Sequence, residues 1–109
     1  MIVNIASVVG TRTGVVGATG DGASKGGVVA LTKGLAVELG GKGVRVNVIV
    51  PGYVDTEMLT PGEREDAVGR TPLGRVGTVE EVADVAEFLV KCGFVNGAEV
   101  VVDGGLSCT

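Results

Sequence analysis

The sequence predicts an α/β fold in which helices pack on a parallel sheet. Short apolar runs alternate with helical patterns, glycine-rich segments follow the apolar runs, and aromatic residues make up only 3% of the chain. Strands buried on both faces have continuous apolar sequences, and helices lie on such sheets through aliphatic side chains. A chain of 109 residues is long enough for one core, so we expect a single unit over residues 1–109.

The first third of the chain predicts a strand, a loop and a helix. Residues 2–6 form an apolar run that leads into a glycine-rich segment, which is typical of a buried strand. Residues 10–22 contain five glycines and three threonines, so we expect a loop there. Over residues 23–39 apolar side chains recur every three or four positions, which predicts a helix. The expected buried stripe of this helix consists of Val28, Leu31, Leu35 and Leu39.

The middle of the chain predicts a second strand and a long loop. Valines alternate with other residues over 44–50 and Pro51-Gly52 follow, which indicates a strand and its end. Because a helix separates the two predicted strands, we expect them to be parallel. Residues 55–78 have no clear period, so we expect a loop with a short helix over residues 63–68.

The last third predicts a capped helix and a final strand. Thr78 and Glu81 have the spacing of a capping box, in which each side chain binds the backbone amide of the other residue. The helix that follows should bury Val82, Val85, Ala86 and Leu89. Residues 99–102 predict a last strand before a turn with two glycines.

Composition argues against several classes of function. The net charge is −4 and no basic cluster is present, so a nucleic-acid partner is not expected. No apolar run approaches the ~20 residues that span a bilayer, and we expect a soluble, cytoplasmic protein without a membrane partner. The chain has no histidine, and Cys92 and Cys108 are far apart, so neither a metal site nor a disulfide framework is predicted.

Six short motifs follow one another along the chain. They are Val3-Asn4-Ile5-Ala6-Ser7, Ala23-Ser24-Lys25-Gly26-Gly27, Arg45-Val46-Asn47, Pro51-Gly52-Tyr53-Val54-Asp55-Thr56, Pro72-Leu73-Gly74-Arg75 and Val102-Asp103-Gly104-Gly105. In this order and spacing they resemble the second half of the short-chain dehydrogenase/reductases, and most of all the 3-oxoacyl-carrier-protein reductases. The resemblance implies an incomplete doubly wound Rossmann-type parallel sheet. It also implies reduction of a 3-oxoacyl thioester in fatty acid synthesis, NADP (or NAD) as cofactor, and a homo- or hetero-oligomer.

The resemblance also implies roles for particular residues. In that family a serine after the strand polarises the substrate carbonyl, a tyrosine supplies the proton, and a lysine one helical turn later assists the tyrosine and holds the cofactor ribose. Ser7 and Lys25 match the serine and the lysine, whereas Asp21 occupies the tyrosine position. The nicotinamide carboxamide pocket would be lined by Pro51, Gly52, Val54 and Thr56.

Aspartate at position 21 changes the expected chemistry. A carboxyl group with a reference pKa of ~3.9 is ionised at neutral pH and has no proton to donate. Its negative charge would also repel the alkoxide that develops in the transition state of ketone reduction. Tyr53, the only tyrosine, lies on a different predicted loop. The spacing of Asp21 and Lys25 also fits a surface ion pair across one helical turn.

A second departure concerns the cofactor. The glycines of residues 10–22 do not have the GxGxxG spacing of a dinucleotide-binding turn. By resemblance, that turn would lie upstream of residue 1, so we expect a truncated family member that does not bind the dinucleotide on its own and is inactive. An alternative is a non-catalytic structural subunit that pairs with a full-length reductase through the stripe of the first helix and the final strand. A third hypothesis is a complete enzyme with tyrosine at position 21.

Overall fold

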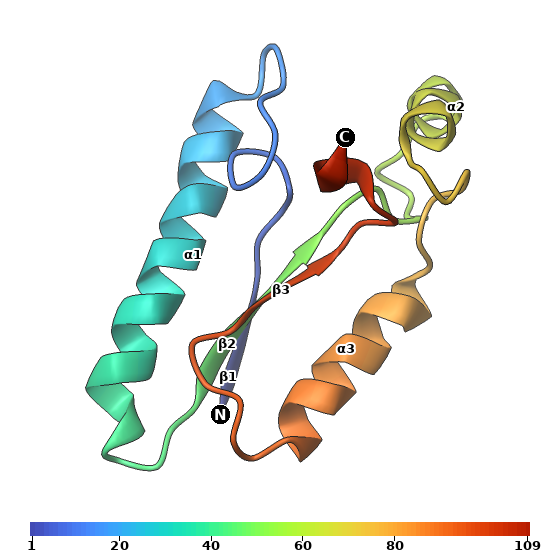
Figure 1. Cartoon of the computed structure of the whole chain (residues 1–109). Coiled ribbons are helices and arrows are strands. Elements are labelled where there is room, and N and C mark those ends of the chain that lie inside the picture. The colour runs from blue at the N-terminus through green and yellow to red at the C-terminus, as the bar shows by residue number, and fades with distance from the viewer.

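A computed structural model describes all 109 residues and contains three strands and three α-helices. These elements are β1 (Ile2–Ile5), α1 (Thr19–Gly40), β2 (Val46–Pro51), α2 (Pro61–Arg70), α3 (Val79–Lys91) and β3 (Glu99–Val102), followed by a short 3₁₀ helix (Leu106–Cys108). The strands form one parallel sheet in the order β1-β2-β3. Helix α1 lies on one side of this sheet and α3 on the other (Figure 1). The predicted α/β fold is confirmed.

Strand β2 is the centre of the sheet and of the core. All residues from Val46 to Val50 are fully buried, because β2 pairs with a strand on each side and contacts a helix on each face. The only polar residue among them, Asn47, has both ends of its amide paired. Its Nδ2 donates to the Val95 carbonyl at 3.0 Å and its Oδ1 accepts from the Ala98 amide at 2.9 Å. Asn47 therefore fixes the segment that leads into β3.

Arg45, directly before β2, joins the end of α3 to the sheet. Its guanidinium donates to the carbonyls of Leu89 and Val90 in the last turn of α3, at 2.9 and 3.1 Å, and to that of Val95 at 3.0 Å. The last carbonyls of a helix lack partners inside the helix, and these bonds satisfy two of them. The motif of residues 45–47 thus has a structural explanation in this chain.

Helix α1 begins four residues earlier than its sequence pattern predicts. Residues 19–22 were expected to belong to a loop, because glycine at positions 20 and 22 disfavours a helix. In the structure Gly22 lies directly against Gly10, and a Cβ atom on Gly10 would be 2.2 Å from the Gly22 Cα. The glycines permit a close approach between backbones, so this tertiary contact, and not helix propensity, explains their presence.

The predicted buried stripe of α1 is wrong in part. The buried residues are Val29, Thr32 and Ala36, whereas the side chain of Leu31 is 55% exposed. Apolar residues occur on all sides of this helix, so their spacing does not identify the side that meets the sheet. The buried side carries smaller residues, and the side-chain Nδ2 of Asn4 in β1 donates to the Thr32 hydroxyl at 3.0 Å. The other predicted stripe residues, Val28, Leu35 and Leu39, are half-buried.

The loop predicted over residues 55–78 contains a full helix, α2, which is longer than the short helix expected over residues 63–68. Thr60 and Glu63 form a capping box at its start, and Pro61 occupies the first position, where proline is favoured. The sequence therefore did contain a start signal for α2. The other capping box, Thr78 with Glu81, begins α3 as predicted. No helix combines the length and hydropathy that a membrane crossing requires.

Candidate functional site

Ser7 lies just beyond the carboxyl end of β1, in a tight turn. The amide of the next residue, Val8, donates to the Pro51 carbonyl at 3.0 Å and so continues the pairing of β1 with β2. The Ser7 Oγ accepts a hydrogen bond from the Val9 amide at 3.1 Å, and the Ser7 carbonyl accepts one from the Thr11 hydroxyl at 2.6 Å. A hydroxyl can accept and donate at once. Ser7 therefore has a fixed oxygen whose own proton is free to be donated.

The turn that carries Ser7 packs on the start of α1. The Val8 carbonyl accepts hydrogen bonds from three amides, those of Thr11, Arg12 and Thr13. This closes the turn and brings Gly10, at φ +77°, onto Gly22 of α1. Because Gly22 belongs to the first turn of α1, the turn of Ser7 and the first turn of α1 are neighbours. Asp21 directly precedes Gly22.

Asp21 and Lys25 lie on α1, one turn apart. Asp21 is exposed in the first turn, and Lys25 is half-buried. None of the ion pairs of the chain joins them, so the surface pair that their spacing allowed is not formed. Ala18, at the start of α1, offers no side-chain cap. A carboxylate in the first turn is favoured by the partial positive charge of the helix N-terminus, which explains why aspartate is tolerated there.

Two of the predicted cofactor residues lie at the carboxyl ends of the strands. Pro51 ends β2, and its carbonyl binds the turn of Ser7. Gly52 donates from its amide to the Val102 carbonyl at 2.9 Å, and a Cβ atom there would be 2.8 Å from the Asp103 Cβ. Pro51 and Gly52 therefore sit between the turns that follow β1 and β3. Ligands of open α/β sheets bind at this edge.

The other two predicted cofactor residues lie farther along the chain. Val54 forms a bridge with Gly77, on the segment before α3. Thr56 is exposed. The described hydrogen bonds connect neither residue to the turn of Ser7. The structure thus joins the turn of Ser7 to Pro51 and to the first turn of α1, and it places Gly52 against Asp103. Val54 and Thr56 lie on an adjoining loop.

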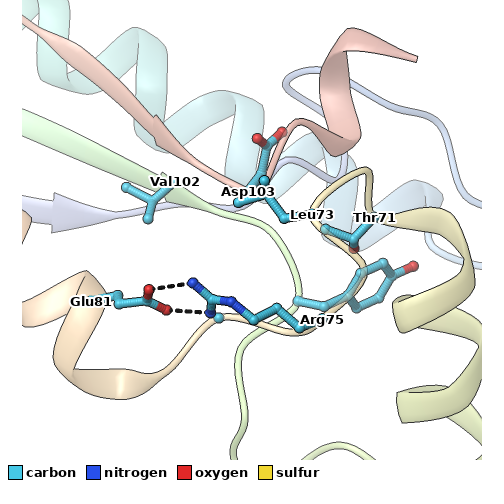
Figure 2. A pocket seen from close by; sticks show the side chains of 9 residues that line it. Thr71, Leu73, Arg75, Glu81, Val102 and Asp103 are labelled. Carbon is cyan, nitrogen blue, oxygen red and sulfur yellow. Dashed lines mark hydrogen bonds and ion pairs between the residues drawn. The ribbon is translucent and has the colours of Figure 1, made fainter.

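A pocket of about 130 Å³ lies between β3, α3 and the loop after α2 (Figure 2). No sequence pattern predicted this pocket. It is lined by Tyr53, Thr71, Leu73, Arg75, Gly77, Glu81, Val102, Asp103 and Gly104. The Tyr53 hydroxyl accepts a hydrogen bond from Arg70 of α2 at 3.0 Å. The motif of residues 72–75 and the capping box of α3 both contribute residues to this pocket. The sequence therefore contains the lining residues in two separate motifs, which the fold brings together.

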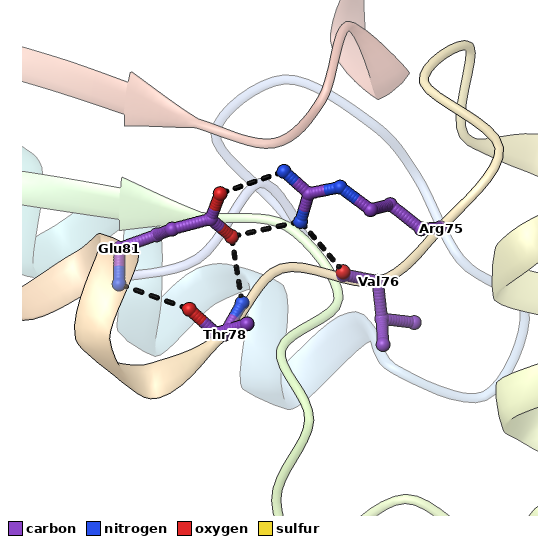
Figure 3. Close-up of polar contacts among 4 residues, drawn as sticks. All are labelled: Arg75, Val76, Thr78 and Glu81. Atoms are coloured by element: carbon purple, nitrogen blue, oxygen red, sulfur yellow. Dashed lines mark hydrogen bonds and ion pairs between the residues drawn. The ribbon is translucent and has the colours of Figure 1, made fainter.

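An ion pair with two hydrogen bonds forms one wall of that pocket (Figure 3). Arg75 donates to both carboxylate oxygens of Glu81, at 2.8 and 2.6 Å, and the Thr78 amide donates to the same carboxylate at 2.8 Å. The bond from Arg75, followed by the bond from Thr78, lowers the pKa of Glu81 to about 2. The same pair raises the pKa of Arg75. The Glu81 side chain therefore connects the loop before α3 to the helix start.

Protonation of Glu81 should destabilise the fold. The pKa of Glu81 is lower in the folded chain than its ordinary value of 4.5. The contribution of the Glu81 carboxylate to stability is therefore complete above pH 4.5 and is lost as the pH falls toward 2. We expect Glu81→Gln to lower the urea midpoint at pH 7 and to have a smaller effect at pH 2.5. Urea unfolding at both pH values measures this, with Glu80→Gln as the control, because Glu80 is exposed and unpaired. Equal losses at both pH values would contradict the assignment.

Asp103 stabilises the turn after β3. Its carboxylate accepts hydrogen bonds from the amides of Gly105 at 2.9 Å and Ser107 at 2.8 Å. Burial raises the pKa of Asp103, but these hydrogen bonds outweigh burial, and the net pKa lies below its ordinary value. The carboxylate thus caps the final helical turn. No group of three or more histidine, cysteine, aspartate or glutamate side chains could hold a metal ion.

The comparisons with known proteins show the family of this chain. A family model described as enoyl-(acyl carrier protein) reductase matches residues 1–107. The chain belongs to the short-chain dehydrogenase/reductase family. It is 44% identical over 110 residues to a 3-oxoacyl-[acyl-carrier-protein] reductase of Pseudomonas aeruginosa, and 43% identical over 105 residues to carbonyl reductase family member 4 of Xenopus tropicalis. Each alignment covers 96% of this chain and 44% of the relative.

Solved structures of short-chain dehydrogenase/reductases have the same arrangement of elements. A 3-oxoacyl-[acyl-carrier protein] reductase from Brucella melitensis with bound NAD matches with a TM-score of 0.87 at 39% identity, over 96% of this chain and 40% of that one. A gluconate 5-dehydrogenase from Burkholderia cenocepacia, in complex with NADP and tartrate, matches with a TM-score of 0.88 at 34% identity. It is covered over 44% of its length. The chain thus spans less than half of the family members that it matches.

Proposed function

We propose that this chain forms the second half of a reductase of the 3-oxoacyl-carrier-protein type and does not reduce ketones on its own. One observation carries the proposal. The Ser7 hydroxyl, just beyond the carboxyl end of β1, accepts a hydrogen bond from the Val9 amide and donates none within the chain. Its turn packs on Gly22 of α1, and the preceding residue of α1 is Asp21. The donor for a substrate carbonyl is present, whereas the proton source of the family is replaced by a carboxylate.

The residues at this edge perform different parts of the chemistry. The Ser7 hydroxyl, oriented by the Val9 amide, donates a hydrogen bond to the substrate carbonyl and polarises it. The Lys25 ammonium, which has no ion-pair partner in this chain, supplies positive charge near the reacting oxygen. Asp21 has no phenol hydroxyl from which to deliver a proton, and the negative charge of a carboxylate opposes the growing negative charge of the alkoxide. The arrangement favours binding of a carbonyl over its reduction.

A nicotinamide cofactor would supply the hydride when bound. Two of the solved relatives are described with NAD or NADP, which supports this class of cofactor. Its nicotinamide end would be held by Lys25, Pro51, Gly52, Val54 and Thr56. The residues present fit that end only, because the 109 residues contain no GxGxxG turn before a helix to hold the pyrophosphate. Affinity for the dinucleotide should therefore be low in the chain alone.

The proposal is tested by turnover of the purified chain. NADPH absorbance is followed with an acetoacetyl thioester at neutral pH, with the Pseudomonas aeruginosa relative as the positive control. We expect no oxidation of NADPH above the rate without protein. Turnover by the chain, verified by mass and lost in Ser7→Ala, would contradict the proposed inactivity.

The second candidate function is that of a structural subunit, and exposed apolar surface favours it. One edge of β1 has no partner strand, and Ile2 and Ile5 of β1 are 39% and 50% exposed. Leu31 and Val37 of α1 are exposed as well. Unpaired edges and apolar faces are sites of association. Co-expression with a full-length relative should then yield a stoichiometric complex, and a chain that remains monomeric and folded beside that relative would argue against this role.

A further inference from the structure

Glu99, the first residue of β3, has a largely buried carboxylate with two cationic partners. Its side chain is 16% exposed, and its two oxygens face Arg12 Nη2 at 3.2 Å and Lys33 Nζ at 3.7 Å. A carboxylate withdrawn from water is costly unless it is paired, and ion pairs at such positions are less screened than those at the surface. The three residues come from three different parts of the fold.

The partners of Glu99 belong to the two elements that carry the candidate catalytic residues. Arg12 lies in the turn of Ser7, two residues beyond the contact of Gly10 with α1. Lys33 lies on α1, the helix of Asp21 and Lys25. All three residues line one depression between the turn, the helix and the sheet, together with Gly10, Thr11, Gly26 and Val29.

Val8 anchors the start of the turn of Ser7 in the hydrophobic core, where it is buried with Val29 and Val50. Beyond Val8, few contacts hold the turn against the rest of the fold. The Val8 amide binds the end of β2, and Gly10 touches Gly22. The remaining hydrogen bonds of residues 7–13 lie within the turn itself. Residues 14–17, between the turn and α1, are exposed. The pair between Arg12 and Glu99 is the only side-chain ion pair that connects the turn to the sheet.

We propose that Glu99 is a positioning residue, whose carboxylate holds the turn of Ser7 and helix α1 in a fixed relation on β3. The sequence gives no sign of this role, because Glu99 is one charge at the start of an apolar strand and its partners lie 87 and 66 residues earlier. The catalytic role of Ser7 rests on the proposed function. The rigidity of its turn does not depend on that function, and it can be measured without catalysis.

Hydrogen exchange of the full chain tests the proposal. Glu99→Gln keeps the size of the side chain and removes its charge, so amides of residues 8–13 should exchange about two- to tenfold faster. Amides of α3 should be unaffected. Glu87→Gln is the matched control, because it removes the ion pair with Lys91 on α3 and leaves the turn alone. An unchanged exchange rate in the turn of Glu99→Gln, or a turn without protection in the parent chain, would overturn the proposal.

Substitutions of Arg12 separate positioning from a general loss of stability. Arg12→Gln should loosen the turn about as much as Glu99→Gln, because both variants remove the ion pair between Arg12 and Glu99. For the same reason, combining the two substitutions should loosen the turn little further. Arg12→Lys retains the charge and should restore most of the protection. Equal loosening by Arg12→Lys and Arg12→Gln would overturn the role of the ion pair. If Glu99→Gln unfolds the whole chain, the Arg12 variants still test the ion pair, because the Arg12 side chain is exposed and its substitution should not unfold the chain. Turnover of NADPH by the chain would refute its inactivity and leave this result untouched.

Discussion

Replacing Asp21 with tyrosine should raise ketone reduction by about 10²- to 10⁴-fold, the usual contribution of a positioned general acid. The change is made in a chimera in which the N-terminal part of the Pseudomonas aeruginosa relative precedes this chain, so that a dinucleotide-binding turn is available. Tyrosine at this position replaces a charge that opposes the alkoxide with a hydroxyl that delivers a proton. The rate constant kcat with an acetoacetyl thioester and NADPH is the measurement.

The controls for this experiment separate the proton from the charge and the size. Asp21→Phe has the ring but no hydroxyl, and Asp21→Asn removes the charge without adding an acid. Both should recover only the part of the rate that the carboxylate charge suppresses, and both should stay well below the tyrosine variant. Recovery with phenylalanine equal to that with tyrosine would show that the carboxylate blocks the site and that no proton comes from position 21. No recovery with tyrosine would place the defect elsewhere in the chain.

Gly10→Ala should destabilise the fold by at least about 2 kcal/mol more than Gly17→Ala. Both glycines have positive φ angles, +77° and +82°, so both substitutions incur a similar backbone strain. A Cβ atom on Gly10 would lie 2.2 Å from backbone atoms of Gly22, whereas one on Gly17 would meet nothing within 4 Å. The difference between the two variants thus isolates the close contact of the Ser7 turn with α1.

Urea unfolding of both variants and of the parent chain measures this difference at neutral pH. Exchange of the amides in residues 8–13 adds a local measurement, because Gly10→Ala should also separate the turn from the helix. Similar midpoints for the two variants would mean that the turn moves away from α1 at little cost. The packing of Ser7 beside Asp21 would then lose its support.

The sequence determined most of the secondary structure and the order of the elements. The strands predicted over residues 2–6 and 99–102 and the capping box of α3 follow from local patterns, because apolar runs and helix capping involve residues close in sequence. The start of α2 also had a local signal, Thr60 with Glu63. Resemblance of six motifs gave the positions of Ser7 and Lys25 and the replacement at Asp21, whose roles in catalysis remain proposals.

Only the tertiary structure decided which surfaces meet. Apolar residues occur on all sides of helix α1, so the spacing of Leu31 and its neighbours did not identify the face that the sheet buries. The helix propensity of Gly22 suggests a loop, yet Gly22 lies within α1, where Gly10 packs directly against it. The contacts of Glu99 with Arg12 and Lys33 join residues far apart in the chain. Such contacts depend on how the backbone brings elements together in space. Local sequence patterns involve only residues close in the chain, so they do not predict which distant residues will meet.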